Sequence, residues 1–224
     1  MPTEIRLATL RDANRLAILA AETFPLACPT GTTQQDIDSF IAANLSEARF
    51  EEYLSSPARM ILLAVESAPT GYSMLNFGEP EDAVVRTAVR LRPTVELAKF
   101  FVAGSRHGTG TAQRLMAASL DLAVGQGSHS VWLGVGRRNA RANRFYEKQG
   151  FAAVGTKTFR VGDQVFPNEI VRERHLSPSS RPDGIREAAP VDNLVPAWQY
   201  RAGDRGAVTR SDEHREGSRT TQLP

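Results

Sequence analysis

One segment limits the fold of this chain more than any other. Residues 95–116 combine a strand pattern over Val95–Val102, a turn containing Gly108 and Gly110, and a helix pattern in which apolar or small residues recur at the helical period. Such a turn presents backbone N–H groups at the positive N-terminus of a helix, which is a ready site for an anion. The segment therefore predicts strand–turn–helix architecture and a ligand that carries phosphate.

Three kinds of protein bind phosphate on a turn of this type, and the residues exclude two of them. A P-loop requires Gly-x-x-x-x-Gly-Lys-Ser/Thr, and the turn contains no lysine. A dinucleotide-binding turn requires a third small residue, and Gln113 stands at that place. The third kind is indicated only when a later segment is considered with this one.

Strand and helix patterns alternate along the first 176 residues. Thr9–Asp12 and Thr33 are predicted to cap helices that run to about Glu22 and Leu45. The same patterns place strands at 5–8, 60–67, 71–77, 95–102, 130–135, 151–161 and 165–176, further helices at 48–54, 110–125 and 139–149, a polar loop at 78–93 and a hairpin turn at 162–163.

Composition changes sharply after Leu176. Residues 177–224 hold seven Arg against seven Asp plus Glu, and only six of these 48 residues are Leu, Ile, Val or Phe. So few apolar side chains do not offset the entropy lost when a chain is ordered. We therefore expect one domain over residues 3–176 and a disordered tail over 177–224.

Charge and cysteine content exclude several classes of protein. The formal net charge is only +2, which gives no argument for a nucleic-acid partner. No stretch approaches the roughly 18 apolar residues of a membrane span. The single cysteine, Cys28, offers neither an internal disulfide nor a metal site by itself, and the histidines show no metal-ligand spacing. We expect a cytoplasmic protein that uses no metal.

A second motif lies about 30 residues after the first. Residues 139–151 read Asn-Ala-Arg-Ala-Asn-Arg-Phe-Tyr-Glu-Lys-Gln-Gly-Phe, directly after the strand pattern at 130–135. This segment resembles the GNAT superfamily of N-acetyltransferases, whose pattern there is Asn-x-x-Ala-x-x-Phe-Tyr-x-x-x-Gly-Phe. The turn His107-Gly-Thr-Gly-Thr-Ala112 resembles the signature Gln/Arg-x-x-Gly-x-Gly/Ala of the same superfamily, with His107 in place of Gln or Arg.

The resemblance implies an α/β fold, with a strongly twisted mixed sheet of six or seven strands and helices on both faces. It implies that acetyl-CoA binds where the fourth and fifth strands separate, with its pantetheine arm along the backbone of Phe101 and Val102. Asn139 resembles the residue that touches the cofactor beside the thioester. The pyrophosphate would be held by the turn, through the residues His107, Gly108, Thr109, Gly110, Thr111 and Ala112.

Two catalytic residues are carried over from the resemblance or inferred from position. Tyr146 resembles the general acid that protonates the departing thiolate, and a role in the core stays open for it. Glu96 would share a strand face with Ala98, Phe100 and Val102, where burial raises the pKa of a carboxyl and suits a base. A structural ion pair, or an exposed strand end, stays open for Glu96. Asn139 also fits the role of a helix N-cap.

These residues predict an N-acetyltransferase that moves an acetyl group from acetyl-CoA to a primary amine of a small molecule or a peptide by direct attack. Some segments resemble a bacterial subgroup that includes polyamine acetyltransferases, and an acidic loop at Glu79, Glu81 and Asp82 could attract a cationic amine. A sensor that binds acyl-CoA without turnover is the alternative from another class. The acceptor and the oligomeric state, a homodimer included, stay open.

Overall fold

The structure, a computed structural model, describes residues 3–28, 31–161 and 164–177. Within these residues lies a seven-stranded sheet in the order β1-β2-β3-β4-β5-β7-β6. The strands are β1 (Glu4–Leu7), β2 (Arg59–Val65), β3 (Pro69–Phe77), β4 (Thr94–Val102), β5 (Ser130–Val135), β6 (Ala152–Val161) and β7 (Gln164–His175). The helices are α1 (Ala13–Thr23), α2 (Gln34–Asn44), α3 (Glu47–Ser55), α4 (Ala83–Ala88), α5 (Thr111–Gly125) and α6 (Ala140–Lys148).

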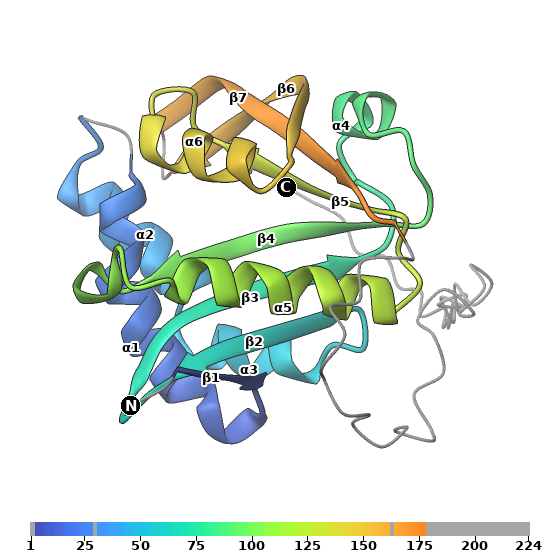
Figure 1. Ribbon diagram of the computed structural model, residues 1–224. Helices are drawn as coiled ribbons and strands as arrows, with labels where there is room; N and C mark the ends of the chain where they lie inside the picture. The colour runs from blue at the N-terminus through green and yellow to red at the C-terminus, as the bar shows by residue number, and fades with distance from the viewer. Residues whose placement is uncertain (1–2, 29–30, 162–163, 178–224) are drawn as a thin grey trace, which may run out of the picture.

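Helices cover both faces of this mixed sheet, as the sequence predicts (Figure 1). One core lies between the sheet and α1–α3 and includes Leu16, Phe50 and Tyr72. A second core lies on the opposite face, under α5 and α6, and includes Met116 and Leu133. Burial of these two apolar layers against one sheet is the main source of the stability of the fold.

The pairing of β4 with β5 is short and is the only parallel pairing in the described sheet. It joins Thr94, Val95 and Glu96 to residues 130–132, while β4 continues to Val102. Beyond Glu96 the two strands diverge, which is visible in the left half of Figure 1. The last six residues of β4 therefore present an edge that β5 does not pair.

A β-bulge at Ala98 corrects one prediction about β4. Leu97 pairs with Leu75 and Lys99 pairs with Met74, so Ala98 is an extra residue without a partner on β3. Strict alternation would put Glu96, Phe100 and Val102 on one face. The bulge changes this, because Phe100 packs into the core under α5 and α6, whereas Ala98 packs into the core under α1–α3.

Most helix boundaries follow their predicted caps. The Thr33 hydroxyl accepts the Asp36 N–H at 3.1 Å and begins α2. The predicted polar loop at 78–93 is wrong in one part, because it contains α4, which Asp82 caps by accepting the N–H groups of Val84 and Val85. The predicted turn at 162–163 and all but the first residue of the predicted tail lie outside the described residues.

Candidate active site

The glycine turn leads into α5 with a left-handed backbone. Gly108 has φ 83° and Gly110 has φ 85°, values that favour glycine. The first hydrogen bond of the helix runs from Arg114 N–H to the Gly110 carbonyl at 3.1 Å. The amides of Thr111 and Ala112 thus precede the helical hydrogen-bond ladder and are available to an anion at the positive end of the helix.

His107 links the end of β4 to α6 across the opening between β4 and β5. Arg141 on α6 donates to His107 Nδ1 at 2.7 Å, and because arginine has no acceptor, Nδ1 must be the accepting nitrogen. His107 Nε2 then carries the proton and donates to the Val102 carbonyl at 3.2 Å. His107 therefore has a structural role at the mouth of the opening, next to the turn that the sequence predicts it to serve.

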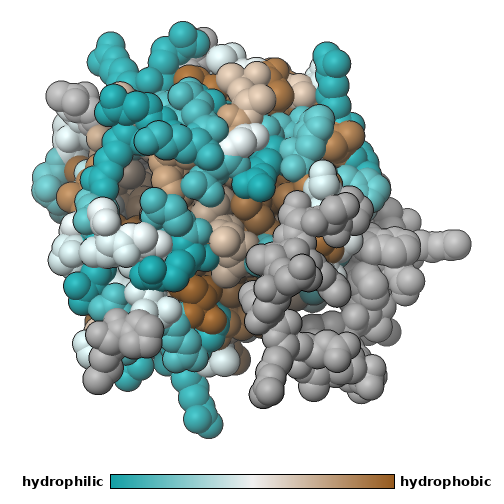
Figure 2. Space-filling view, viewed as in Figure 1, coloured by the Kyte–Doolittle hydropathy of each residue, from teal (hydrophilic) through white to brown (hydrophobic). Residues whose placement is uncertain are grey.

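Phe101 and Val102 lie on the part of β4 that β5 does not pair. The Phe101 ring stacks on Tyr72, with ring centroids 5.5 Å apart, which fixes this end of the strand against the core under α1–α3. Seen from the side of α5 and α6, apolar surface lies in the middle of the face, with hydrophilic side chains at its upper left (Figure 2). An extended, partly apolar chain such as pantetheine fits an unpaired strand edge of this kind.

Tyr146 lies on α6 inside an aromatic cluster. Its ring centroid is 6.3 Å from that of Phe100, 5.6 Å from that of Phe145 and 5.8 Å from that of Phe151, and 9% of the residue is exposed. None of the described residues forms a hydrogen bond with its hydroxyl. Burial, with a smaller contribution from the charge of Glu169, raises the pKa of Tyr146 and keeps the phenol protonated.

Asn139 caps α6, because its side-chain oxygen accepts the Ala142 N–H at 3.0 Å. The neighbouring Asn143 is buried and donates to the carbonyls of Gly136 and Asn139, at 3.0 and 2.9 Å. Arg172 on β7 in turn donates to Asn143 at 3.0 Å. The start of α6 is therefore held against β5 and β7, and the sequence analysis missed this role of Asn143.

Glu96 faces a cavity of about 420 Å³ on the sheet face opposite to α5. In the sheet register, Arg59 pairs with Asn76, Asn76 with Glu96, and Glu96 with Trp132. These four residues therefore form one row across β2, β3, β4 and β5, and all four line the cavity. Asn76 donates to Glu96 Oε2 at 3.0 Å, and no described residue forms an ion pair with Glu96.

Glu169 on β7 is a second carboxylate near this region, and the sequence analysis missed it. It forms an ion pair with Lys157 at 3.7 Å, and the pair sits over Gly134, where a Cβ would lie 2.7 Å from Glu169 Oε2. Burial raises the pKa of Glu169, Lys157 lowers it, and the charge of Glu96 adds a small upward contribution. Glu169 thus interacts electrostatically with both predicted catalytic residues, Glu96 and Tyr146.

Comparison with known proteins decides the family. The model of the acetyltransferase (GNAT) family matches residues 27–151. The chain belongs to the GNAT acetyltransferase family. It is 45% identical over 168 residues to an uncharacterised N-acetyltransferase of Mycobacterium tuberculosis and to one of Mycobacterium bovis, which covers 75% of this chain and 99% of each relative.

Solved GNAT structures share the fold. The PaiA N-acetyltransferase of Thermoplasma acidophilum, in complex with coenzyme A, is 18% identical with a TM-score of 0.64 and covers 78% of this chain and 99% of that chain. The ribosomal-protein-S5-alanine acetyltransferase of Vibrio fischeri is 12% identical with a TM-score of 0.57 and covers 80% of this chain and 96% of that chain. At these identities the likeness concerns the fold, which confirms the predicted architecture.

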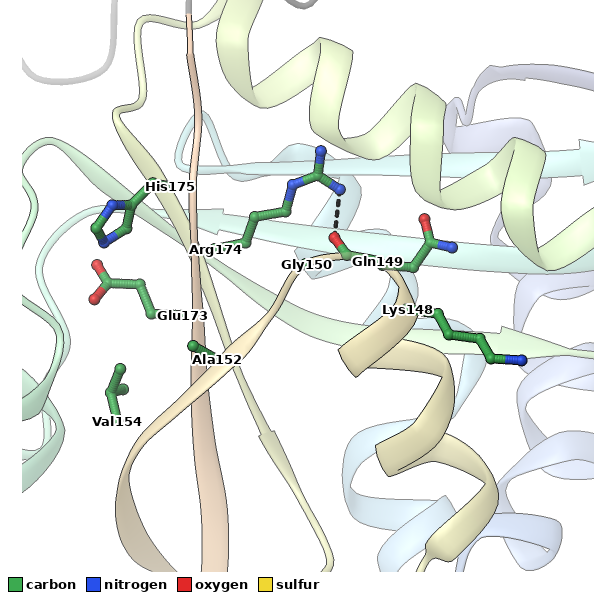
Figure 3. Close-up of a pocket in the computed structure, with 8 residues that line it drawn as sticks. All are labelled: Lys148, Gln149, Gly150, Ala152, Val154, Glu173, Arg174 and His175. Carbon is green, nitrogen blue, oxygen red and sulfur yellow. Dashed lines mark hydrogen bonds between the residues drawn. The ribbon is translucent and has the colours of Figure 1, made fainter.

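A larger cavity, of about 560 Å³, lies elsewhere in this GNAT domain. It is bounded by the end of α6, the start of β6 and the end of β7, and none of the predicted site residues lines it (Figure 3). Arg174 donates to the Gln149 carbonyl at 2.5 Å there, and Glu173 accepts the N–H groups of Arg90 and Leu91, both at 3.3 Å. Because these hydrogen bonds hold the ends of the strands in place, we assign the residues around this cavity a structural role.

The structure also bears on Cys28, on metal binding and on membrane spans. Cys28 is half-buried, its thiol lies 3.5 Å from the Phe24 carbonyl, and burial raises the pKa of that thiol, which does not favour a nucleophile. Among the described residues, no group of three or more His, Cys, Asp and Glu side chains is arranged to hold a metal ion. No helix in the described part of the chain is long and apolar enough to cross a membrane.

Proposed function

We propose that this GNAT protein transfers an acetyl group from acetyl-CoA to a primary amine by direct attack. The observation that carries the proposal is the divergence of β4 and β5 after Glu96. The glycine turn and Tyr146 lie on the α5 and α6 side of this opening, and the cavity that holds Glu96 lies on the other side. An acyl donor and an acceptor can therefore approach one point from opposite faces of the sheet.

The residues fit the donor in three respects. The turn offers backbone N–H groups and two glycines without Cβ atoms where a pyrophosphate would lie. The unpaired edge of β4 at Phe101 and Val102 offers backbone groups to the amides of pantetheine. Exposed Arg137, Arg138 and Arg141 follow β5 and add positive charge on that side of the opening.

The reaction requires a proton acceptor and a proton donor, and we propose one on each face of the sheet. A primary amine with a reference pKa near 10.4 must lose a proton before it attacks, and Glu96 accepts it directly or through water. The amine nitrogen forms a bond to the thioester carbonyl carbon, and a backbone N–H of β4 stabilises the oxyanion. The carbon–sulfur bond then breaks, and the sulfur takes the proton of the Tyr146 hydroxyl, so that CoA leaves as a thiol. The nitrogen of the new amide loses its extra proton, and uptake of one proton through solvent restores the Tyr146 hydroxyl.

A thiol-release assay with acetyl-CoA and a panel of primary amines tests the proposal. We expect CoA release that depends on both the enzyme and an amine, with the acetylated amine detected by mass spectrometry. Tight binding of acetyl-CoA without release for any amine would favour the sensor alternative. No binding of acetyl-CoA to the folded protein would overturn both.

A further inference from the structure

Three positive side chains gather around the ring of Tyr53, on the same sheet face as the Glu96 cavity. The guanidinium carbons of Arg49 and Arg59 lie 5.2 and 5.0 Å from the ring centroid, and Lys99 Nζ lies 5.3 Å from it. The Tyr53 hydroxyl is itself fixed, because it donates to the Asn44 carbonyl at 3.1 Å. The three cations thus share one rigid aromatic support at the edge of the cavity that Arg59 lines.

Negative charge does not balance this cluster. Arg49 pairs with Glu52, but no described carboxylate forms an ion pair with Arg59 or Lys99. Burial lowers the pKa of Lys99 to about 8, Glu96 opposes this shift, and the charges of Arg59 and Arg49 add to it. Like charges that gather on one ring in a partly buried setting repel one another, so an anion placed among them would be stabilised.

The cluster and Glu96 lie at two ends of one binding surface. Arg59 and Glu96 are separated in the row by Asn76 alone, which puts their Cα atoms two strand spacings, roughly 10 Å, apart. The buried Asn76 Oδ1 and Trp132 Nε1 in the same row have no hydrogen-bond partner. The cavity wall is thus positive at Arg59, negative at Glu96, and holds an unused donor and an unused acceptor.

Glu79, Glu81 and Asp82 of the acidic loop also line the cavity, but they do not supply a second negative site comparable to Glu96. Glu79 forms an ion pair with Arg92 at 2.5 Å, and Asp82 is the cap of α4. Two of the three carboxylates of this loop therefore already have positive or N–H partners. The charges that remain do not favour an acceptor with a positive group at each end.

We propose that the acceptor carries an anionic group, a carboxylate or a phosphate, several bonds away from its primary amine. The anion binds between Arg59 and Lys99, and the amine lies at Glu96 next to the opening between β4 and β5. This inference rests on the proposed function and names the class of its acceptor. Such an acceptor differs from a polyamine, which has only positive groups to offer to the same cluster.

The experiment compares acceptors that differ only in the group at the far end. For each of several chain lengths, kcat/KM is measured for an ω-amino carboxylate, the simple alkylamine and the diamine; 6-aminohexanoate, hexylamine and 1,6-diaminohexane form one such set. An ω-amino phosphonate set separates phosphate from carboxylate recognition. We expect the anionic member to be favoured at least about tenfold at the best length, since a charge-assisted hydrogen bond has that worth.

Variants connect the preference to the cluster. Arg59→Gln and Lys99→Met should each reduce the preference for the anionic acceptor about tenfold, whereas Arg59→Lys, which keeps the charge, should retain most of it. The preference is the ratio of kcat/KM for the anionic acceptor to kcat/KM for the alkylamine, and the KM for acetyl-CoA should change less than about threefold in all variants. Arg15→Gln, an exposed position on α1, is the matched control and should change nothing.

Equal or better use of the alkylamine or the diamine at every length would overturn the inference and leave the proposed function intact. So would an anion preference that survives both Arg59→Gln and Lys99→Met. If no amine supports thiol release, the proposed function fails, and calorimetry with the N-acetylated compounds still tests the pocket. Tighter binding of the acetylated amino carboxylate, lost in Arg59→Gln, would support the inference, and equal binding of all three would overturn it.

Discussion

Glu96 and Tyr146 lie on opposite faces of the β-sheet, next to the point where β4 and β5 separate. Glu96 is the last residue of β4 that pairs with β5, and it lines the cavity on the side of Trp132. Tyr146 packs against Phe100 in the core under α5 and α6. The proton acceptor and the proton donor that we propose thus lie on either side of one opening, and each can be tested separately.

Tyr146→Phe tests whether the Tyr146 hydroxyl is the general acid. The change removes only a hydroxyl that makes no hydrogen bond with a described residue, so the aromatic cluster and the free energy of unfolding should change little. We expect kcat to fall on the order of 10²-fold, with kcat/KM falling equally and acetyl-CoA affinity within a few-fold of the wild type. Steady-state kinetics and calorimetry measure these quantities. Wild-type kcat in this variant would remove Tyr146 from the mechanism.

Glu96→Gln tests whether Glu96 is the general base. Glutamine keeps an oxygen for the Asn76 donor but cannot take a proton, so kcat/KM near pH 7 should fall by about 10²-fold or more. The loss should shrink as the pH rises toward the pKa of the amine, because more of the substrate is then already deprotonated.

Glu169→Gln is the matched comparison for Glu96→Gln. It leaves Lys157 without its carboxylate partner, and we expect a smaller effect on kcat/KM than in Glu96→Gln. The pH–rate profile of each variant distinguishes the two. If Glu169→Gln has the larger effect and Glu96→Gln little, the base is Glu169, whose raised pKa suits the task.

Gly110→Asp tests the phosphate site. It puts a carboxylate and a Cβ at the N-terminus of α5 and should abolish acetyl-CoA binding measured by calorimetry. Gly110→Asn adds similar bulk without charge and should bind more tightly than Gly110→Asp. Gly127→Asp, at the opposite end of α5 with φ 76° and no atom near a new Cβ, controls for backbone strain and should bind normally. Unchanged affinity in Gly110→Asp would contradict the assignment of the turn.

Asp12→Asn tests a charged contact at the start of α1. The Asp12 carboxylate accepts two bonds from Arg6, at 2.8 and 2.7 Å, and one from the Thr9 N–H, at 2.9 Å. These bonds hold the pKa of Asp12 well below its usual range, chiefly through Arg6. The contribution to stability is therefore present above the unfolded pKa of about 3.9 and is lost as the pH falls through the lower folded value.

We accordingly expect Asp12→Asn to lower the free energy of unfolding by about 1.5–3 kcal/mol near pH 7, because its bonds involve charged groups. The difference from the wild type should shrink as the pH falls below about 4. Urea unfolding at a series of pH values measures it. Asp38→Asn, an exposed aspartate on α2, should show neither the loss nor the pH dependence.

Deletion of residues 178–224 tests the domain boundary. Their composition predicts no contribution to the core, and the described residues already form both faces of the sheet. We expect the melting temperature to shift by less than about 2 °C and acetyl-CoA affinity to stay unchanged. A large fall in the melting temperature would show that the domain extends past residue 177.

The strand and helix pattern of the sequence predicts most of the fold, because two features dominate it: strands rich in apolar residues, and helix caps such as Thr33 and Asn139. The helix α4 was missed because six residues are too short to show a helical period. The bulge at Ala98 leaves no mark in the sequence, since a single extra residue in an apolar strand looks like any other.

The site is predicted less completely, because irregular strand pairing and contacts between distant elements leave no local pattern in the sequence. Glu169 meets Lys157 because of an irregularity in the pairing of β6 with β7 between Lys157 and Phe159. A regular hairpin about residues 162–163 would have put Asn168 opposite Lys157 instead. The cation cluster around Tyr53 joins α3 and β2, which are consecutive, to Lys99 on β4, which is distant in sequence, so no local pattern predicts it.

The single extra residue at Ala98 has a consequence for how proteins of this architecture diverge. Because Phe100 turns to the α5 side while Lys99 and Phe101 turn to the other, the side chains that we propose for the acyl donor and those that we propose for the acceptor occupy separate compartments. Substitutions at Arg59, Lys99 or Trp132 alter one compartment and leave the glycine turn untouched. A gene copy can therefore acquire a new acceptor by a few point mutations while it inherits its use of the donor unchanged.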